Sequence, residues 1–198
     1  MQAKANVNWC EDDYATWSRT AEFWNTISNV PIIGAGIAAF VTSQHRSRVF
    51  LVCVALVCVG IGSLWFHATL LRSAQAMDEI SMLVLCAAFA ASIDRTLLWP
   101  ALALLAVALL LYCMWLDAGW LFIVLFALGL VGASAVAWKK CDKHDGFKQA
   151  ALWFGVGFVF WLCDKIWCPA HPAQVLHALW HIGASIAGYH AIHAIDRC

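Results

Sequence analysis

The sequence predicts an all-α integral membrane protein, a bundle of seven transmembrane helices. Of its 198 residues, 63% are hydrophobic and only 12% are Asp, Glu, Lys or Arg, and the mean hydropathy is +0.76. A soluble domain carries about 25% charged residues to cover its surface, so this chain needs lipid around it. Its 12 Trp and 11 Phe exclude a disordered chain. The zero net charge provides no field that would attract nucleic acid.

Seven apolar stretches are long enough to cross a bilayer core of about 30 Å as helices. They extend over residues 22–42, 49–71, 76–93, 97–115, 119–138, 148–167 and 173–195. Each is continuous rather than alternating, which argues against the strands of a membrane barrel. An acidic N-terminal arm, residues 1–21, precedes them, and the longest internal stretch that looks solvated is 139–147. We therefore expect residues 1–198 to form a single membrane domain.

The first stretch is the least apolar, because it contains Asn25, Ser28, Asn29 and Pro31. Polar residues are costly in lipid, so we expect this helix to pack inside the bundle. It lacks a basic flank and a small-residue cleavage site, and we therefore do not interpret it as a cleavable signal peptide.

The basic residues predict the orientation in the membrane, since seven spans place the two termini on opposite sides. The N-terminal side holds Lys4, Arg19, Arg72 and Lys165. The C-terminal side holds Arg46, Arg48, Arg95, Lys139, Lys140, Lys143, Lys148 and Arg197. Cytoplasmic loops carry the excess of Lys and Arg. The N-terminus is therefore expected to be extracytoplasmic or lumenal, and the C-terminus cytoplasmic.

Polar residues within the second, third and seventh stretches predict a metal site. Ser63 and His67 are four residues apart near the end of the second stretch, and His177 and His181 repeat this spacing in the seventh. Residues four apart share one helix face, and the topology brings Asp78, at the start of the third stretch, to the same membrane depth. Three histidines with an acid and a hydroxyl beside them fit a catalytic zinc that keeps one position open for water.

A single intramembrane histidine is better explained as a hydrogen-bonded packing residue. The convergence of His67, His177 and His181 at one depth is what favours a metal instead. His190 and His193 lie two or three turns further along the last stretch. They are too far from His181 to bind the same ion, so we interpret them as packing or interfacial residues.

The N-terminal arm contains a second candidate site. Side-chain oxygens of Asn8, Glu11, Asp13 and Glu22, with a backbone carbonyl, would suit calcium. Composition alone favours a simpler interpretation, a solvated acidic cap whose Glu22 complements the positive end of the first helix.

The nine cysteines divide by their predicted location. Five lie within spans and serve as small apolar residues: Cys53, Cys58, Cys86, Cys113 and Cys163. Cys141 and Cys198 fall on the cytoplasmic side. Cys10 and Cys168 are the two on the outer side, where an oxidising compartment would permit a disulfide between them.

Several segments along nearly the whole chain together resemble the alkaline ceramidase family, within a wider group of seven-helix membrane hydrolases that includes the progestin and adipoQ receptors. The segments are NWCEDDY at 8–14, AEFWNTISN at 21–29, GIGSLWFHATL at 60–70, MDE at 77–79, WLCDKIWC at 161–168 and HALWH at 177–181. The wider group shares only the Ser, His, Asp and paired-His elements, whereas the arm and AEFWN point to the ceramidases.

The resemblance implies a role for each candidate residue. His67, His177 and His181 would hold zinc, Ser63 would lie beside the metal-bound water, and Asp78 would be the acid/base. In the arm, calcium would be bound by Asn8, Glu11, Asp13, Glu22 and the Trp9 carbonyl. The family has an acid where Asn8 stands and an amide where Asp13 stands, an exchange that preserves total charge. Cys10 and Cys168 match a disulfide of the family.

We therefore expect an intramembrane, zinc-dependent amidase that hydrolyses the N-acyl bond of ceramide, or of a related lipid amide, to a sphingoid base and a free fatty acid. Two other classes are open: a lipid or hormone receptor of the adipoQ-receptor type, which would use the zinc structurally, and a proton or metal transporter, which would need polar groups along a full transmembrane path. The expected location is a bacterial inner membrane or an internal eukaryotic membrane such as the ER or Golgi.

Overall fold

The computed structural model describes residues 3–115, 119–142, 145–168 and 173–198, and nearly all of them beyond the arm are helical. The elements are α1 (Phe23–Ile27), α2 (Val30–Thr42), α3 (Arg46–Thr69), α4 (Arg72–Ile93), the 3₁₀ turn η1 (Arg95–Leu97), α5 (Leu98–Met114), α6 (Gly119–Lys140), α7 (Asp145–Trp167), the 3₁₀ turn η2 (Ala173–Val175) and α8 (Leu176–Asp196). The described residues contain no β-strand, and one isolated bridge pairs Lys4 with Leu71. The all-helical class is therefore confirmed.

The first predicted stretch corresponds to α1 and α2 together, and each of the others corresponds to one helix. Several boundaries differ by up to four residues, as at α3, which begins at Arg46 rather than at residue 49, and α4, which begins at Arg72 rather than at residue 76. The described residues include six helices long and apolar enough to cross a membrane, the first running through Phe23–Thr42. Helix α8 is 21 residues long but is not among the six, because its four histidines lower its hydropathy. The loop expected at 139–147 is shorter than predicted, since α6 continues to Lys140 and α7 begins at Asp145.

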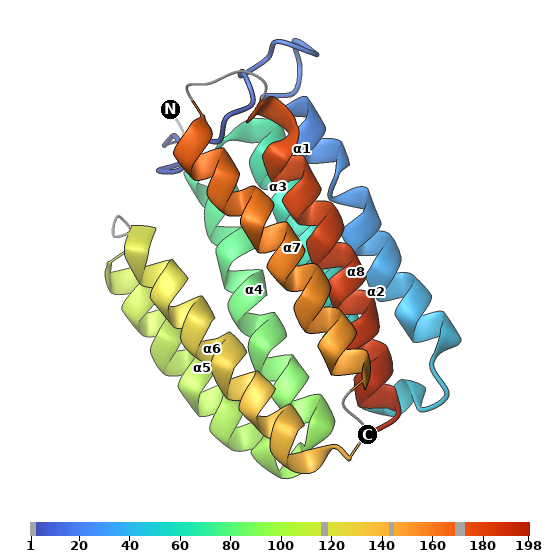
Figure 1. Cartoon of the computed structure of the whole chain (residues 1–198). Helices are drawn as coiled ribbons and strands as arrows, with labels where there is room; N and C mark the ends of the chain where they lie inside the picture. The colour runs from blue at the N-terminus through green and yellow to red at the C-terminus, as the bar shows by residue number, and fades with distance from the viewer. Residues whose placement is uncertain (1–2, 116–118, 143–144, 169–172) are drawn as a thin grey trace.

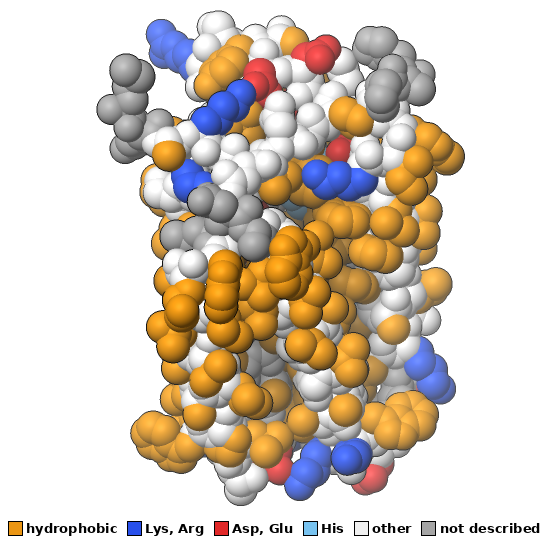
Figure 2. Space-filling model, turned by 90° about the vertical axis from the view of Figure 1, so that its left-hand side faces the viewer, with side chains coloured by type: hydrophobic (Ala, Val, Ile, Leu, Met, Phe, Trp, Pro, Cys, Tyr) orange, Lys and Arg blue, Asp and Glu red, His pale blue; other side chains and the backbone are white. Residues whose placement is uncertain are grey.

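The long helices lie side by side, and the two chain ends lie at opposite ends of the bundle (Figure 1). Helix α8 packs against α7, α2 and α3, whereas α5 and α6 pack on α4 at one side. Apolar side chains cover the middle of the face seen in Figure 2, and Lys, Arg, Asp and Glu gather toward its two ends. This pattern is typical of a protein that crosses a bilayer.

The main apolar core lies between α2, α3 and α8 and consists of buried aliphatic residues from all three, among them Ile32, Val52, Leu56 and Ile192. Small residues allow neighbouring helices to come close, as is common in membrane bundles. Between α7 and α8 the approach is so close that a Cβ atom added at Gly183 would lie 2.8 Å from the Gly157 Cα. This packing fixes the position of α8, which carries two of the candidate ligands.

The first predicted span is interrupted, because α1 ends at Ile27 and α2 begins at Val30. Pro31 occupies the first turn of α2, where its missing N–H costs no helical hydrogen bond. The side chains of Asn25, Ser28 and Asn29 are all buried. The polar side chains of this span therefore face the interior of the bundle, but Val30, Ile37 and Val41 are exposed on its other side, so the expectation of a helix packed inside the bundle is confirmed only for its polar face. The interruption places Ser28 at the level of the histidines.

Candidate active site

Three buried histidines meet at one end of the bundle. His67 lies in the last turn of α3, and His177 and His181 lie in the first two turns of α8. One ring nitrogen from each falls within 4.8 Å of the others, and the side chains are at most 3% exposed. His193 lies far along α8, where its Nε2 atom is 3.0 Å from the Thr42 hydroxyl. The histidine group therefore contains the three that the sequence predicted.

Each of the three imidazoles is held by a neighbour outside the cluster. The Nδ1 atom of His67 lies 2.5 Å from Glu22 Oε2, and the Nδ1 atom of His181 lies 2.7 Å from Ser28 Oγ. The ring of His177 stacks on Trp9 with 3.5 Å between centroids. With Nδ1 engaged, His67 and His181 keep Nε2 for the centre of the cluster. Partners of this kind orient the ligands of a metal and fix their tautomer.

The C-terminal end of α3 positions Glu22 beside His67. The last carbonyls of a helix lack helical donors, and here the N–H of Glu22 donates to the His67 carbonyl at 3.0 Å and the N–H of Ala21 to the Ala68 carbonyl at 3.0 Å. Ala5 donates to the Leu70 carbonyl at 2.8 Å. Leu70 itself adopts a left-handed conformation, with φ of 49°, which ends the helix. The arm is thus hydrogen-bonded to the helix end that carries His67.

Ser63 and Asp78 lie beside each other, one turn of α3 from His67. Their side chains form a hydrogen bond. The contact depends on a close approach between α3 and α4, because a Cβ atom added at Gly62 would lie 3.1 Å from the Asp78 backbone nitrogen. The structure therefore brings together a hydroxyl, a carboxyl and three imidazoles, a constellation suited to acyl-transfer hydrolysis.

The acidic residues of the arm have varied partners. Glu11 accepts hydrogen bonds from the backbone N–H groups of Trp24 and Asn25, at 2.6 and 2.8 Å, and so caps α1. Glu22 Oε1 accepts from the Trp9 N–H at 3.1 Å. Burial raises the pKa of Glu11, against the lowering effect of those N–H donors.

The other two candidate calcium ligands are held less firmly. Asp13 Oδ2 lies 3.6 Å from the Lys4 ammonium, while its Oδ1 atom is buried without a partner among the described residues. Asn8 is exposed. The acids therefore gather as the sequence suggested, but Glu11 and Glu22 already accept hydrogen bonds from protein groups. The calcium site stays a prediction.

Two disulfides connect distant segments. Cys10 pairs with Cys168, with Cα atoms 5.0 Å apart, and this joins the arm to the end of α7. Cys141 pairs with Cys198 at the opposite end of the bundle, with Cα atoms 4.9 Å apart. The second pair was not predicted. Cys141 is only 4% exposed, although the sequence placed it in a solvated loop.

Sequence reasoning also missed Asp164 on α7, a carboxylate that is 1% exposed. Its Oδ2 atom accepts a hydrogen bond from the Cys10 N–H at 3.4 Å, and the Lys165 ammonium beside it lies 3.7 Å from the Trp9 ring. Trp9 in turn stacks on His177. An acid near the end of an apolar stretch is the signal that the sequence offers.

Comparisons with known proteins agree on one family. The sequence model described as Ceramidase matches residues 1–198. Alkaline ceramidase 3 of Mus musculus is 28% identical over 225 residues, which cover 93% of this chain and 80% of the relative. An alkaline ceramidase of Arabidopsis thaliana is 29% identical, with the same coverage of both chains. Alkaline ceramidase 1 of Mus musculus is 39% identical over a shorter region, 42% of this chain and 32% of the relative.

Proposed function

The chain belongs to the ceramidase family, and we propose that it is an intramembrane amidase that hydrolyses the N-acyl bond of ceramide to a sphingoid base and a free fatty acid. The relatives that match most of its length are named alkaline ceramidases. The observation that carries the proposal is the group of His67, His177 and His181, with Ser63 and Asp78 beside it.

The histidine group fits zinc by the chemistry of its donors. Catalytic zinc sites have three protein ligands and an open fourth position, and three imidazoles are one of the known ligand sets. The Nδ1 atom of His177 is buried without a hydrogen-bond partner among the described residues, although buried polar atoms are normally satisfied. When bound there, zinc would supply a Lewis acid that activates water and polarises the amide carbonyl.

The protein's own groups perform the proton transfers in this mechanism. Asp78 accepts the proton of the attacking water as general base, and returns it to the departing amine as general acid. Ser63 donates a hydrogen bond from its hydroxyl to the Asp78 carboxylate before the reaction. Once Asp78 has taken the proton of the water, it can donate to Ser63 instead, and the Ser63 O–H is free to donate to the oxyanion of the tetrahedral intermediate. Glu22 and Ser28 keep the His67 and His181 rings in orientation.

The location of the site suits a lipid amide. The three histidines lie near the end of the bundle at which the arm folds, and apolar side chains cover the middle of the face seen in Figure 2. A substrate can therefore keep its hydrocarbon chains in lipid while its amide reaches the polar residues.

For the topology, we propose that α8 is the seventh span and that residues 1–198 form one membrane domain. In support, α8 packs along α7 and α2, and the termini lie at opposite ends of the bundle. The excess of Lys and Arg at the C-terminal end supports an extracytoplasmic or lumenal N-terminus, in a bacterial inner membrane or an ER- or Golgi-type membrane.

Mass spectrometry of purified protein supplied with zinc and a panel of N-acyl sphingoid bases tests this function. We expect release of fatty acid and sphingoid base in equal amounts, and no release above background for His181→Ala, which removes one ligand. Specific binding of ceramide without any product would favour the receptor of the adipoQ-receptor type. A zinc-dependent proton or metal flux in vesicles, without product, would favour a transporter.

We propose in addition that the arm binds calcium through Asn8, Glu11, Asp13, Glu22 and the Trp9 carbonyl. The support is the gathering of several acids, the unpartnered Asp13 Oδ1 atom and the raised pKa of Glu11, in which the negative charge of Glu22 takes part. A cation among these groups would relieve their repulsion. Oxygen atoms of this kind are the ligands that calcium prefers.

Thermal unfolding in the presence of calcium or of a calcium chelator tests the arm site. Ligand at 100 times its Kd stabilises the folded state by about 2.7 kcal/mol, so we expect a melting temperature higher by several degrees with calcium, and a smaller rise for Glu11→Gln. Asp12→Asn is the matched control, because Asp12 is an arm acid outside the candidate set and contacts Gln174. Identical melting curves with and without calcium would favour the solvated cap.

A further inference from the structure

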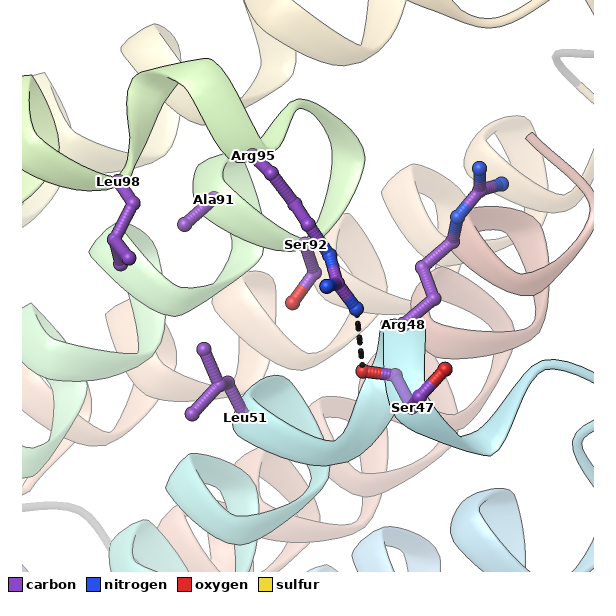
Figure 3. A pocket seen from close by; sticks show the side chains of 7 residues that line it. All are labelled: Ser47, Arg48, Leu51, Ala91, Ser92, Arg95 and Leu98. Carbon is purple, nitrogen blue, oxygen red and sulfur yellow. Dashed lines mark hydrogen bonds between the residues drawn. The ribbon is translucent and has the colours of Figure 1, made fainter.

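A cavity of about 210 Å³ opens at the end of the bundle opposite the histidines, between the start of α3, the end of α4 and the start of α5 (Figure 3). Two arginines and two serines line it: Arg48, Arg95, Ser47 and Ser92. None of them belongs to the candidate active site. Two arginines lining one small cavity are typical of a site for an anion.

Among the described residues, no acid pairs with the two arginines of this cavity. The guanidinium of Arg48 forms no hydrogen bond or ion pair with the described residues. Arg95 donates one hydrogen bond, from Nη2 to the Ser47 carbonyl at 3.2 Å, and a guanidinium has five N–H donors. The nearest acid along the chain, Asp94, is already paired with the Lys140 ammonium at 2.8 Å and bonded to Thr96. Both arginines therefore keep donors for a ligand.

Ser92 provides an independent sign of a ligand. It lines the cavity, is only 4% exposed, and its hydroxyl has no hydrogen-bond partner among the described residues. A buried hydroxyl without a partner costs free energy, and an oxygen atom of a bound anion would accept its proton. Figure 3 shows Ser92, near the end of α4, beside the Arg95 side chain of η1, whereas Arg48 extends from the start of α3 away from both.

The remaining walls are apolar and identify the class of ligand. Leu51, Ala91 and Leu98 line the cavity. Leu51 is 49% exposed, and Trp99, next to the cavity in the chain, is 77% exposed. Trp is enriched at membrane interfaces, so this opening lies where lipid head groups meet hydrocarbon. Basic pockets between transmembrane helices bind the head groups of anionic lipids.

We propose that this cavity binds the phosphate group of an anionic phospholipid, with Arg95 and Ser92 as its donors, the positive charge of Arg48 at its rim, and Leu51 and Leu98 against the first methylenes of an acyl chain. The site is separate from the hydrolytic centre and does not depend on the proposed amidase activity. A lipid bound there would connect α3, α4 and α5 at an end of the bundle where α5 packs mainly on α4.

Native mass spectrometry of the purified protein with phosphatidylglycerol or phosphatidylcholine tests the site. We expect the unchanged protein to bind phosphatidylglycerol more tightly than phosphatidylcholine. Its affinity for phosphatidylglycerol should fall about five-fold in Arg48→Gln and about 25-fold in the double variant Arg48→Gln/Arg95→Gln, the factors expected for the loss of one and two cations near an anionic head group. Lys139→Gln/Lys148→Gln is the matched control, because both lysines lie at the same end outside the cavity. It should bind like the unchanged protein.

A competition with inorganic phosphate distinguishes a phospholipid from free phosphate as the ligand of the cavity. Displacement of phosphatidylglycerol by millimolar phosphate would show that the phosphate group alone occupies the site, whereas no displacement would show that the acyl chains contribute. Arg48→Gln guards against misfolding of the double variant, since the Arg48 guanidinium has no partner among the described residues. Equal affinity for the two lipids, or equal weakening in the lysine control, would overturn the proposal.

Discussion

Replacing Asp78 by Asn is expected to lower the rate of amide hydrolysis by about 10²- to 10⁴-fold, the range that a general acid/base contributes. An amide has the size of the carboxyl and can keep the hydrogen bond to Ser63, but it cannot accept the proton of the attacking water. The histidine ligands are unchanged. We therefore expect full zinc content with almost no turnover, measured by metal analysis and by fatty-acid release on the same sample.

The matched control for this variant is Asp145→Asn. Asp145 opens α7 at the opposite end of the bundle, where its side chain is almost fully exposed and bonds to Lys148. The Asp145→Asn protein should hydrolyse ceramide at the same rate as the unchanged protein. A zinc-loaded Asp78→Asn protein with normal turnover would remove Asp78 from the mechanism, and Ser63 would then have to be reconsidered as the group that handles the proton.

The three-histidine group could be predicted because two regularities act together. The spacing of His177 and His181 places both on one helix face, and the alternating direction of successive spans brings the end of α3 to the depth at which α8 begins. Asp78 follows from the same topology, since α4 begins where α3 ends. These arguments need only helix geometry and bilayer thickness, which is why they hold without knowledge of side-chain packing.

The residues that hold the histidines could not be predicted in this way. Ser28 reaches His181 because the helix breaks between α1 and α2, and no spacing relates two residues 153 positions apart. Glu22 reaches His67 because unpaired carbonyls at the end of α3 bind the backbone of the arm. Composition favours a helix cap as the role of Glu22 and gives no sign of its contact with His67. The disulfide between Cys141 and Cys198 could not be predicted either, because it depends on the ends of α6 and α8 lying close together.

Replacing Glu22 by Gln is expected to weaken zinc binding by about 10- to 100-fold, the usual effect of removing a partner of a metal-bound histidine. The carboxylate of Glu22 is fully buried and contacts His67 Nδ1. Its negative charge fixes the tautomer that presents Nε2 and makes that nitrogen more basic. Gln is close in size and can still accept from the Trp9 N–H, so the variant removes the charge and leaves most of the packing.

Zinc affinity, measured by competition with a chelator of known strength, separates this orienting role from the role of Glu22 as a calcium ligand. If Glu22 acts through His67, the affinity falls equally with and without calcium. If it acts only through the arm, the fall appears only when calcium is present. Glu79→Gln is the matched control, because Glu79 is a buried acid near the same end that bonds to Gln75 and Tyr112 rather than to a histidine. Unchanged zinc affinity of Glu22→Gln under both conditions would contradict the carboxylate–histidine pairing as a support of the metal site.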